Sequence, residues 1–199
     1  MKPKDTGEAY NQITYLWERK DFDRNNGIEQ HRRAIAFAKN RGKALDVGCG
    51  CSDRIIRLLF KNGFSPEGID VSSEMLKIIR AKCSDITFHH GDIVEGQLTE
   101  KYDFISAWDS IWHVPLDQQK QLLKKLFNAL HSGGVCIFTC GALDEPGEHT
   151  NRAMGPEVYY SSLGIENYMN VIFTEKCACR HFEHDDFPES HAYFIVQKL

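Results

Sequence analysis

Apolar residues along the chain follow two spacings, one typical of helices and one typical of buried strands. Residues 8–20 and 27–40 carry apolar side chains every three or four positions, which predicts two amphipathic helices at the start of the chain. Five short runs then predict buried strands, the fourth of them rich in the aromatic and β-branched residues that strands prefer. These runs are 43–47, 66–71, 86–90, 102–108 and 135–140.

Helical spacing separates these runs. Residues 53–62 and 73–82 each carry an apolar stripe, and a third helix is expected from Asp117, whose side chain is a candidate cap. The sequence SGG at 132–134 is expected to end that helix before the fifth strand. Strands that alternate with helices form a parallel sheet with right-handed crossovers and helices on both faces.

The end of the chain departs from this alternation. A helix predicted at 165–176 is followed by two extended segments, 177–184 and 192–198. The connection DDFPES between these segments is short enough only for a hairpin. The predicted fold is therefore α/β, Rossmann-like and doubly wound, with a mostly parallel seven-stranded sheet and an antiparallel final strand.

One polar connection, residues 141–160, is longer than the roughly 12–15 residues expected of a structureless loop. We interpret it as a lid over a functional site, with disorder as the alternative.

Composition narrows the classes of partner. The 199 residues suffice for one domain, and the formal net charge is -4 with scattered lysines and arginines. This excludes the basic footprint expected of a protein that binds nucleic acid or an anionic membrane. An odd count of seven cysteines and an N-terminus without an apolar leader predict a cytoplasmic protein with reduced thiols.

A glycine loop follows the first predicted strand. Gly48 and Gly50 stand between that strand and a helix, where a tight turn lets the backbone approach a ligand. Asp53 stands where a dinucleotide-binding fingerprint requires glycine, and its carboxylate would repel a pyrophosphate. S-adenosylmethionine has no phosphate and carries a cationic sulfonium and a cationic amine, which Asp46 is placed to attract.

Two further acids follow the next two strands. Asp70 lies about 20 residues after the loop, where an acid binds ribose hydroxyls in a βαβ unit. Asp92 follows the third strand, where an acceptor can meet the amine of an adenine. Open α/β sheets bind ligands at the carboxyl ends of their strands, so these acids predict a nucleoside site.

Several segments now resemble the class I S-adenosylmethionine-dependent methyltransferases. The segments are ALDVGCGCSD, GIDVSSEML, GDI, and LHSGG with VCIFTC. The closing hairpin is also similar to that family, whose seventh strand is antiparallel. The resemblance implies that S-adenosylmethionine is the cofactor and that residues 1–42 are N-terminal helices capping an active site in a cofactor-binding domain at 43–199.

The resemblance also implies the cofactor contacts. The glycine loop would line the methionine, the acid after the second strand the ribose and the acid after the third the adenine, while an aromatic face would wall the sulfonium. The implied residues are Gly48, Cys49, Gly50, Asp70, Val71, Asp92, Ile93 and Trp108. Ser52 departs from the family, many members of which carry a third glycine there.

Methyl transfer chiefly requires alignment of the acceptor and exclusion of water. His113 follows the fourth strand and is the best candidate base, although packing at a helix start is an equal alternative. Asp109 is a candidate to orient His113 or to hold the acceptor. Candidate substrate contacts are Trp17, His149, Arg152 and Tyr160.

The motif Asn/Asp-Pro-Pro-aromatic of nucleic-acid amine methyltransferases is missing after the fourth strand, which favours a small-molecule acceptor. Two other functions stay open: a regulatory protein that binds the cofactor without transfer, and a nicotinamide-dependent oxidoreductase.

Cys177, Cys179 and His181 alternate and would share one strand face, but the second ligand pair of a zinc motif is missing, so no metal is expected.

Overall fold

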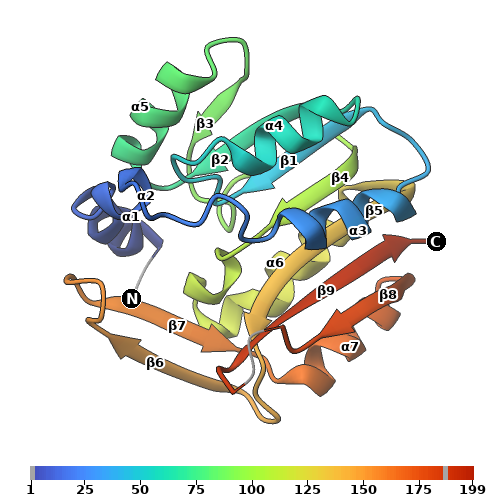
Figure 1. Cartoon of the computed structure of the whole chain (residues 1–199). Coiled ribbons are helices and arrows are strands. Elements are labelled where there is room, and N and C mark those ends of the chain that lie inside the picture. Colours follow the sequence, from blue (N-terminus) through green and yellow to red (C-terminus); the bar gives the residue numbers. More distant parts are fainter. Residues whose placement is uncertain (1–2, 186–187) are drawn as a thin grey trace.

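The computed structural model describes residues 3–185 and 188–199, which are built around a seven-stranded sheet of order β3-β2-β1-β4-β5-β9-β8 (Figure 1). The strands are β1 Lys43–Val47, β2 Ser65–Asp70, β3 Phe88–His90, β4 Tyr102–Ala107, β5 Leu130–Gly141, β8 Cys177–Glu183 and β9 His191–Lys198. Neighbouring strands from β3 to β5 run parallel, and β9 pairs antiparallel with both β5 and β8. The predicted fold class is confirmed.

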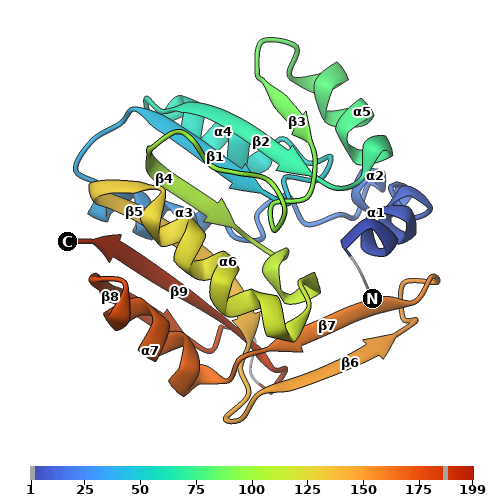
Figure 2. The same ribbon diagram turned by 180° about the vertical axis from the view of Figure 1, so that it is seen from behind.

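Helices cover both faces of the sheet (Figures 1 and 2). The helices α3 (Ile28–Phe37) and α4 (Arg54–Lys61) share one apolar cluster with the sheet, and α5 (Ser73–Lys82) packs beside them against β2 and β3. The helices α6 (Leu116–Asn128) and α7 (Ile165–Thr174) share the cluster on the opposite face.

Strand β5 shows why the sheet needs helices on both sides. Phe138 and Cys140 belong to the cluster under α6 and α7, whereas Val135 and Ile137 belong to the cluster under α3 and α4. Successive side chains of a strand point to opposite faces, so a continuous apolar run is stable only when both faces are covered.

The single helix expected at 8–20 is wrong, because the chain forms two helices there, α1 (Pro3–Asn11) and α2 (Tyr15–Glu18). At the end of α1, the Asn11 side-chain oxygen accepts hydrogen bonds from the Ser72 hydroxyl (2.7 Å) and the Glu74 amide (3.1 Å). These contacts tie α1 to the first turn of α5, a partner that local spacing does not reveal.

Asp117 does not cap α6. Pro115 holds the N-cap position and Asp117 lies in the first turn, where the Leu116 amide donates instead to the Tyr159 hydroxyl of β7 (3.1 Å). The SGG segment was expected to precede the fifth strand, but it lies within β5. This strand already pairs at Leu130 with Tyr102 of β4, and the pairing resumes beyond Gly133 after a register shift.

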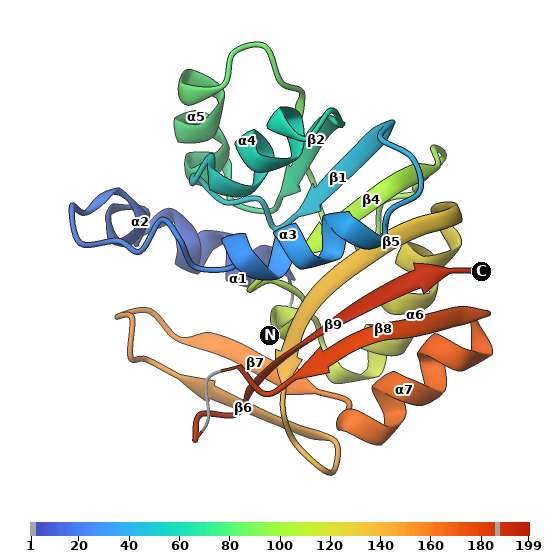
Figure 3. The ribbon, with the colours of Figure 1, turned by 45° about the vertical axis from the view of Figure 1, so that its right-hand side comes forward.

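Residues 141–160 are neither a loop nor disordered. Most of them belong to an antiparallel hairpin of β6 (Gly147–Asn151) and β7 (Val158–Ser162), which extends beyond the main sheet (Figure 3). Strand β7 is anchored through Ser161, whose carbonyl accepts from the Gln119 side chain (2.9 Å) and whose hydroxyl donates to the Val114 carbonyl (2.6 Å).

Cys177, Cys179 and His181 do not share one face, contrary to the prediction. A register shift between Cys179 and His181 reverses the alternation. Both cysteines pack with the α6–α7 cluster, whereas His181 contacts the Tyr193 ring and the Arg33 side chain of α3 on the other face.

The connection between β8 and β9 includes residues 186–187, which lie outside the described part of the chain. Within residues 3–185 and 188–199, none of the helices combines the length and apolar character needed to cross a membrane.

Candidate functional site

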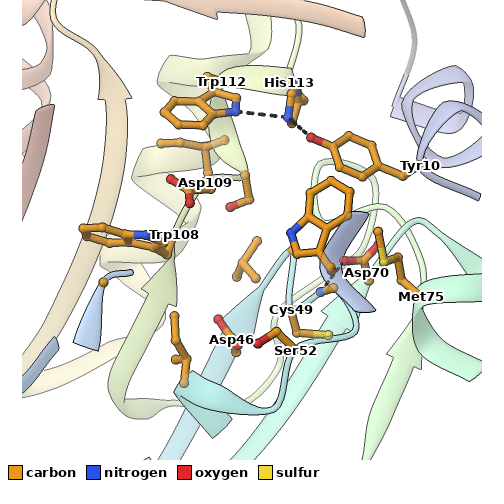
Figure 4. Close-up of a pocket in the computed structure, with 18 of the residues that line it drawn as sticks. Tyr10, Asp46, Cys49, Ser52, Asp70, Met75, Trp108, Asp109, Trp112 and His113 are labelled. Atoms are coloured by element: carbon orange, nitrogen blue, oxygen red, sulfur yellow. Dashed lines mark hydrogen bonds between the residues drawn. The ribbon is translucent and has the colours of Figure 1, made fainter. Parts of the chain in front are cut away.

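A cavity of about 720 Å³ lies at the carboxyl ends of β1, β2 and β4 (Figure 4). Its volume is in the range of sites that enclose small ligands. The residues predicted from the sequence that line it are Trp17, Asp46, Gly48, Cys49, Gly50, Asp70, Val71, Asp92, Ile93, Trp108, Asp109, His113 and Tyr160. His149 and Arg152 are not among the lining residues.

Gly48 and Gly50 shape the loop at one end of the cavity, which we call the nucleoside end. Both have left-handed backbones, with φ of 69° and 57°. A Cβ at Gly48 would lie 2.4 Å from the Ser110 Cβ, so only glycine fits there. The Gly50 amide donates a 2.8 Å hydrogen bond to Asp70, which joins the loop to the end of β2.

The Asp70 carboxylate is held in place by backbone amides. One oxygen accepts from Gly50 and the other accepts from Ser72, both at 2.8 Å. Burial raises the pKa of Asp70, and the amide hydrogen bonds oppose that rise. An oriented carboxylate with unused lone pairs is suited to accept hydrogen bonds from vicinal hydroxyls.

Asp46 ends a buried polar chain that reaches α3. Burial raises the pKa of Asp46 to about 7, and its interaction with Ser106 opposes that rise. Ser106 Oγ also lies 3.0 Å from His31 Nε2, and His31 Nδ1 lies 2.6 Å from the Gly27 carbonyl. Because burial lowers the pKa of His31 to about 4, the ring is neutral and its Nδ1 carries the donated proton. A nearby cationic ligand would favour ionised Asp46.

Three buried hydroxyls in the cavity lining indicate what kind of ligand fits there. Among the described residues, Thr6 Oγ1, Ser52 Oγ and Ser110 Oγ have no hydrogen-bond partner in the protein, and all three residues line the cavity. Buried polar atoms are normally satisfied, so a ligand with several hydrogen-bonding groups fits this lining. Asp92 adds a carboxylate held by the Val94 amide (2.8 Å).

The opposite end of the cavity, which we call the acceptor end, contains His113 in the short 3₁₀ helix η1 (Ile111–His113). Its Nδ1 lies 2.8 Å from the Tyr159 carbonyl, and its Nε2 lies 2.8 Å from the Tyr10 hydroxyl and 3.0 Å from the Trp112 Nε1 (Figure 4). The carbonyl only accepts and the indole only donates, so Nδ1 is protonated and Nε2 accepts. Burial lowers the pKa of His113 to about 4, which keeps this neutral form.

Asp109 pairs with His191 rather than with His113. His191 Nε2 lies 3.4 Å from Asp109, and His191 Nδ1 contacts Asp185. Burial alone would lower the pKa of His191, but the hydrogen bonds to both carboxylates outweigh burial and raise it to about 9. The ring is therefore an imidazolium near neutral pH, between two carboxylates.

The remaining predicted contacts lie around this end. The Trp108 indole donates to the Asn26 side chain (2.8 Å), and Trp17 packs on Tyr10 with ring centres 5.4 Å apart. His149 stacks on the outer side of Tyr160 at 5.2 Å. Arg152 is exposed and bonds Glu157 within the hairpin.

Sequence reasoning missed Tyr10, Trp112, Asp185 and His191 as lining residues. Tyr10 falls within the apolar stripe predicted at 8–20, and its contact with His113 joins residues 103 positions apart. His191 stands at the first position of a buried strand, where no local motif marks it. The sequence held one clue: these residues lie in or next to segments that were predicted to carry other site residues.

The comparisons with known proteins agree with this geometry. Residues 44–134 match the model of a methyltransferase domain family. The chain is 22% identical over 161 residues to phosphoethanolamine N-methyltransferase of Plasmodium falciparum, covering 77% of this chain and 60% of that protein. It is 30% identical over 137 residues to demethylmenaquinone methyltransferase of Anoxybacillus flavithermus, covering 59% and 57%. The chain thus spans about 60% of the length of these curated relatives.

Solved structures share the fold. An S-adenosylmethionine-dependent methyltransferase of Clostridium acetobutylicum superposes with a TM-score of 0.71 at 15% identity, covering 96% of this chain and 99% of that one. An amino pentose methyltransferase of Micromonospora echinaspora with bound S-adenosylmethionine gives a TM-score of 0.65 at 15% identity, covering 88% and 91%.

The sheet order, the antiparallel β9 and the cavity at the strand ends define a Rossmann-like fold whose glycine loop lacks the pyrophosphate fingerprint. Residues 44–134 match the methyltransferase domain family, and the fold of the chain is the one found in solved S-adenosylmethionine-dependent methyltransferases.

Proposed function

We propose that this protein transfers the methyl group of S-adenosylmethionine to a small-molecule acceptor. The observation that carries the proposal is one cavity that joins the nucleoside end, with Gly50 and Asp70, to the acceptor end, with Asp109 and His113. Two ligands in contact inside one cavity are what a direct group transfer requires.

The nucleoside end supplies the binding groups for the cofactor. Asp70 would accept hydrogen bonds from the ribose, with Val71 beside it, and Asp92 with Ile93 would contact the adenine. Asp46 would attract the methionine amine along the loop of Gly48, Cys49 and Gly50. When bound, S-adenosylmethionine supplies an electrophilic methyl group on a sulfonium, and the face of Trp108 would attract that positive charge.

The acceptor end supplies alignment. His113 holds the Tyr10 hydroxyl and the Trp112 indole through its Nε2. Service as a general base would require one of these two donors to leave that nitrogen, so we assign His113 first to positioning. Tyr10 belongs to α1, so the N-terminal helices within residues 1–42 would close the cavity over the acceptor.

A small acceptor is favoured by the size of the cavity, about 720 Å³, and by the relatives. The named acceptors of the two relatives, phosphoethanolamine and demethylmenaquinone, are both small molecules. Tyr160 and Trp17 line the cavity and would contact the acceptor, whereas we leave Arg152, which pairs with Glu157, out of the proposed site.

Calorimetric titration tests this function, followed by product analysis. We expect S-adenosylhomocysteine to bind and NAD to release no binding heat. Incubation with methyl-labelled S-adenosylmethionine and pooled small metabolites is expected to yield a labelled product. Tight NAD binding would overturn the proposal, and cofactor binding without any labelled product would indicate a regulatory protein instead.

A further inference from the structure

Asp109 is held in a strained backbone conformation at the acceptor end. Its φ is 52°, in the left-handed region that residues other than glycine adopt uncommonly. The Asp109 amide donates a 2.8 Å hydrogen bond to the Thr139 hydroxyl of β5, which fixes this turn. The carboxylate lines the cavity with about a third of its side chain exposed (32%). Strain retained at a cavity points to a functional constraint on that side chain.

The ionisable side chains that line the cavity are mostly acidic. Among the described lining residues, Arg54 is the single arginine or lysine, and its Nε already donates to the Asn26 carbonyl (2.9 Å). The lining carboxylates are Asp23, Glu29, Asp46, Asp70, Asp92, Asp109 and Asp185. The His191 imidazolium lies between two of them and offsets part of that charge. Such a lining favours ligands of net positive charge over anions.

Aromatic rings form a continuous wall beside Asp109. Trp112 is central to it, with its ring centre 5.4 Å from His191 and 6.4 Å from Tyr160. The wall continues through Tyr160 to His113 (4.9 Å), and from His113 to Tyr10 (5.3 Å). In Figure 4 Asp109 lies between the indoles of Trp108 and Trp112. Aromatic faces next to a carboxylate are the recognition elements for alkylammonium groups.

We propose that the methyl acceptor is an amine, held by Asp109 against the aromatic wall. This inference rests on the proposed methyl transfer and names its substrate class. Asp109 accepts an N–H of the amine, which leaves the nitrogen lone pair free to point toward the nucleoside end.

The charges balance in this reaction. The ammonium form loses one proton to solvent, and the lone pair of the free amine then forms the nitrogen–carbon bond. The carbon–sulfur bond breaks with its electron pair on sulfur, so the positive charge passes from sulfur to nitrogen. Carboxylates at both ends of the cavity stabilise that charge before and after transfer. A carboxylate or phosphate on the acceptor would instead lie beside Asp109, so amines without anionic groups are the expected substrates.

Choline and its neutral isostere 3,3-dimethylbutan-1-ol test the proposal by binding, without turnover. With S-adenosylhomocysteine present, we expect choline to quench tryptophan fluorescence with an affinity about tenfold or more above that of the neutral isostere. Asp109→Asn keeps the side-chain shape and tolerates a positive φ, and we expect it to remove most of this preference while S-adenosylhomocysteine affinity stays within about twofold. Asp85→Asn, at an exposed position, is the matched control and is expected to behave as wild type.

The outcomes separate the two proposals. A preference for choline that is lost in Asp109→Asn supports the amine acceptor. Faster methylation of primary amines without a phosphate than of phosphoethanolamine, measured with methyl-labelled S-adenosylmethionine, also supports it. Equal affinity for choline and the neutral isostere, with S-adenosylhomocysteine bound, overturns the amine class and leaves methyl transfer intact. Failure of S-adenosylhomocysteine to bind overturns both.

Discussion

The two ends of the cavity are built in different ways. The nucleoside end comes from short motifs that follow consecutive parallel strands, and the Gly50–Asp70 hydrogen bond joins positions 20 residues apart. The acceptor end is assembled from α1, η1, β7 and β9, so that Asp109 and His191 meet across 82 positions. The groups proposed to bind the cofactor therefore come from neighbouring stretches of sequence, whereas those proposed to bind the acceptor meet only through long-range assembly.

The largest expected effect is on the free energy of unfolding, which is lowered by the buried Asp46 carboxylate at the nucleoside end. The folded pKa of Asp46, about 7, lies above its unfolded value of about 3.9, so the folded state binds more protons between these pH values. The free energy of unfolding contributed by Asp46 therefore falls as pH rises from about 4 to 7 and stays low above that. We expect Asp46→Asn to be more stable than wild type at pH 8 by on the order of 2–4 kcal/mol.

Urea denaturation of both proteins without ligand at pH 4.5 and pH 8 measures this effect. Asp21→Asn, whose side chain is 80% exposed, is the control and is expected to show no such pH-dependent gain. A difference between Asp46→Asn and wild type that does not change with pH would show that Asp46 is already ionised in the folded protein.

Removal of the Asp70 carboxylate is the next largest effect. A buried ribose would lose a charged acceptor worth roughly 1.5–3 kcal/mol, so Asp70→Ala is expected to weaken S-adenosylhomocysteine binding at least about tenfold. Calorimetry measures the affinity, with the exposed Asp85→Ala as control. Unchanged affinity in Asp70→Ala would mean that the ribose lies elsewhere.

Tyr10→Phe removes one hydrogen bond at the acceptor end. We expect a loss of about 0.5–1.5 kcal/mol in transition-state stabilisation, seen as a severalfold lower kcat, because His113 then holds one donor fewer. The affinity for S-adenosylhomocysteine is expected to stay the same. Tyr15→Phe, at a side chain 61% exposed on α2, is the matched control. A cofactor affinity that fell together with kcat would show that the two ends are not separable.

The smallest effect concerns how α1 is held over the site. Asn11→Ala removes the acceptor for Ser72 and Glu74 at the start of α5 and is expected to cost about 1 kcal/mol of unfolding free energy. Thermal denaturation measures the loss, and Gln12→Ala is the neighbouring control. If both variants melt at the wild-type temperature, the contact between α1 and α5 does not hold the N-terminal segment in place.

Sequence periodicity was sufficient for the sheet because its central strands β1, β4, β5 and β9 are buried along most of their length and its helices carry apolar stripes. The motif acids were also predictable, since each directly follows or ends a strand. Their roles as cofactor ligands stay predictions until a ligand is bound.

The features that escaped prediction depend on distant partners. Asn11 ends α1 because its acceptor oxygen bonds residues more than sixty positions away. Strand β6 is polar and exposed along its length, so its pairing with β7 left no alternating pattern. The register shift before His181 and the contact of His191 with Asp109 likewise arise only when the sheet is assembled.

The most direct test of the account is a crystal structure of the protein grown with S-adenosylhomocysteine. We expect the nucleoside to lie along the strand ends, with its ribose hydroxyls bonded to Asp70 and its sulfur facing the end that holds Asp109. An empty cavity, or a nucleoside bound away from Asp70, would contradict it.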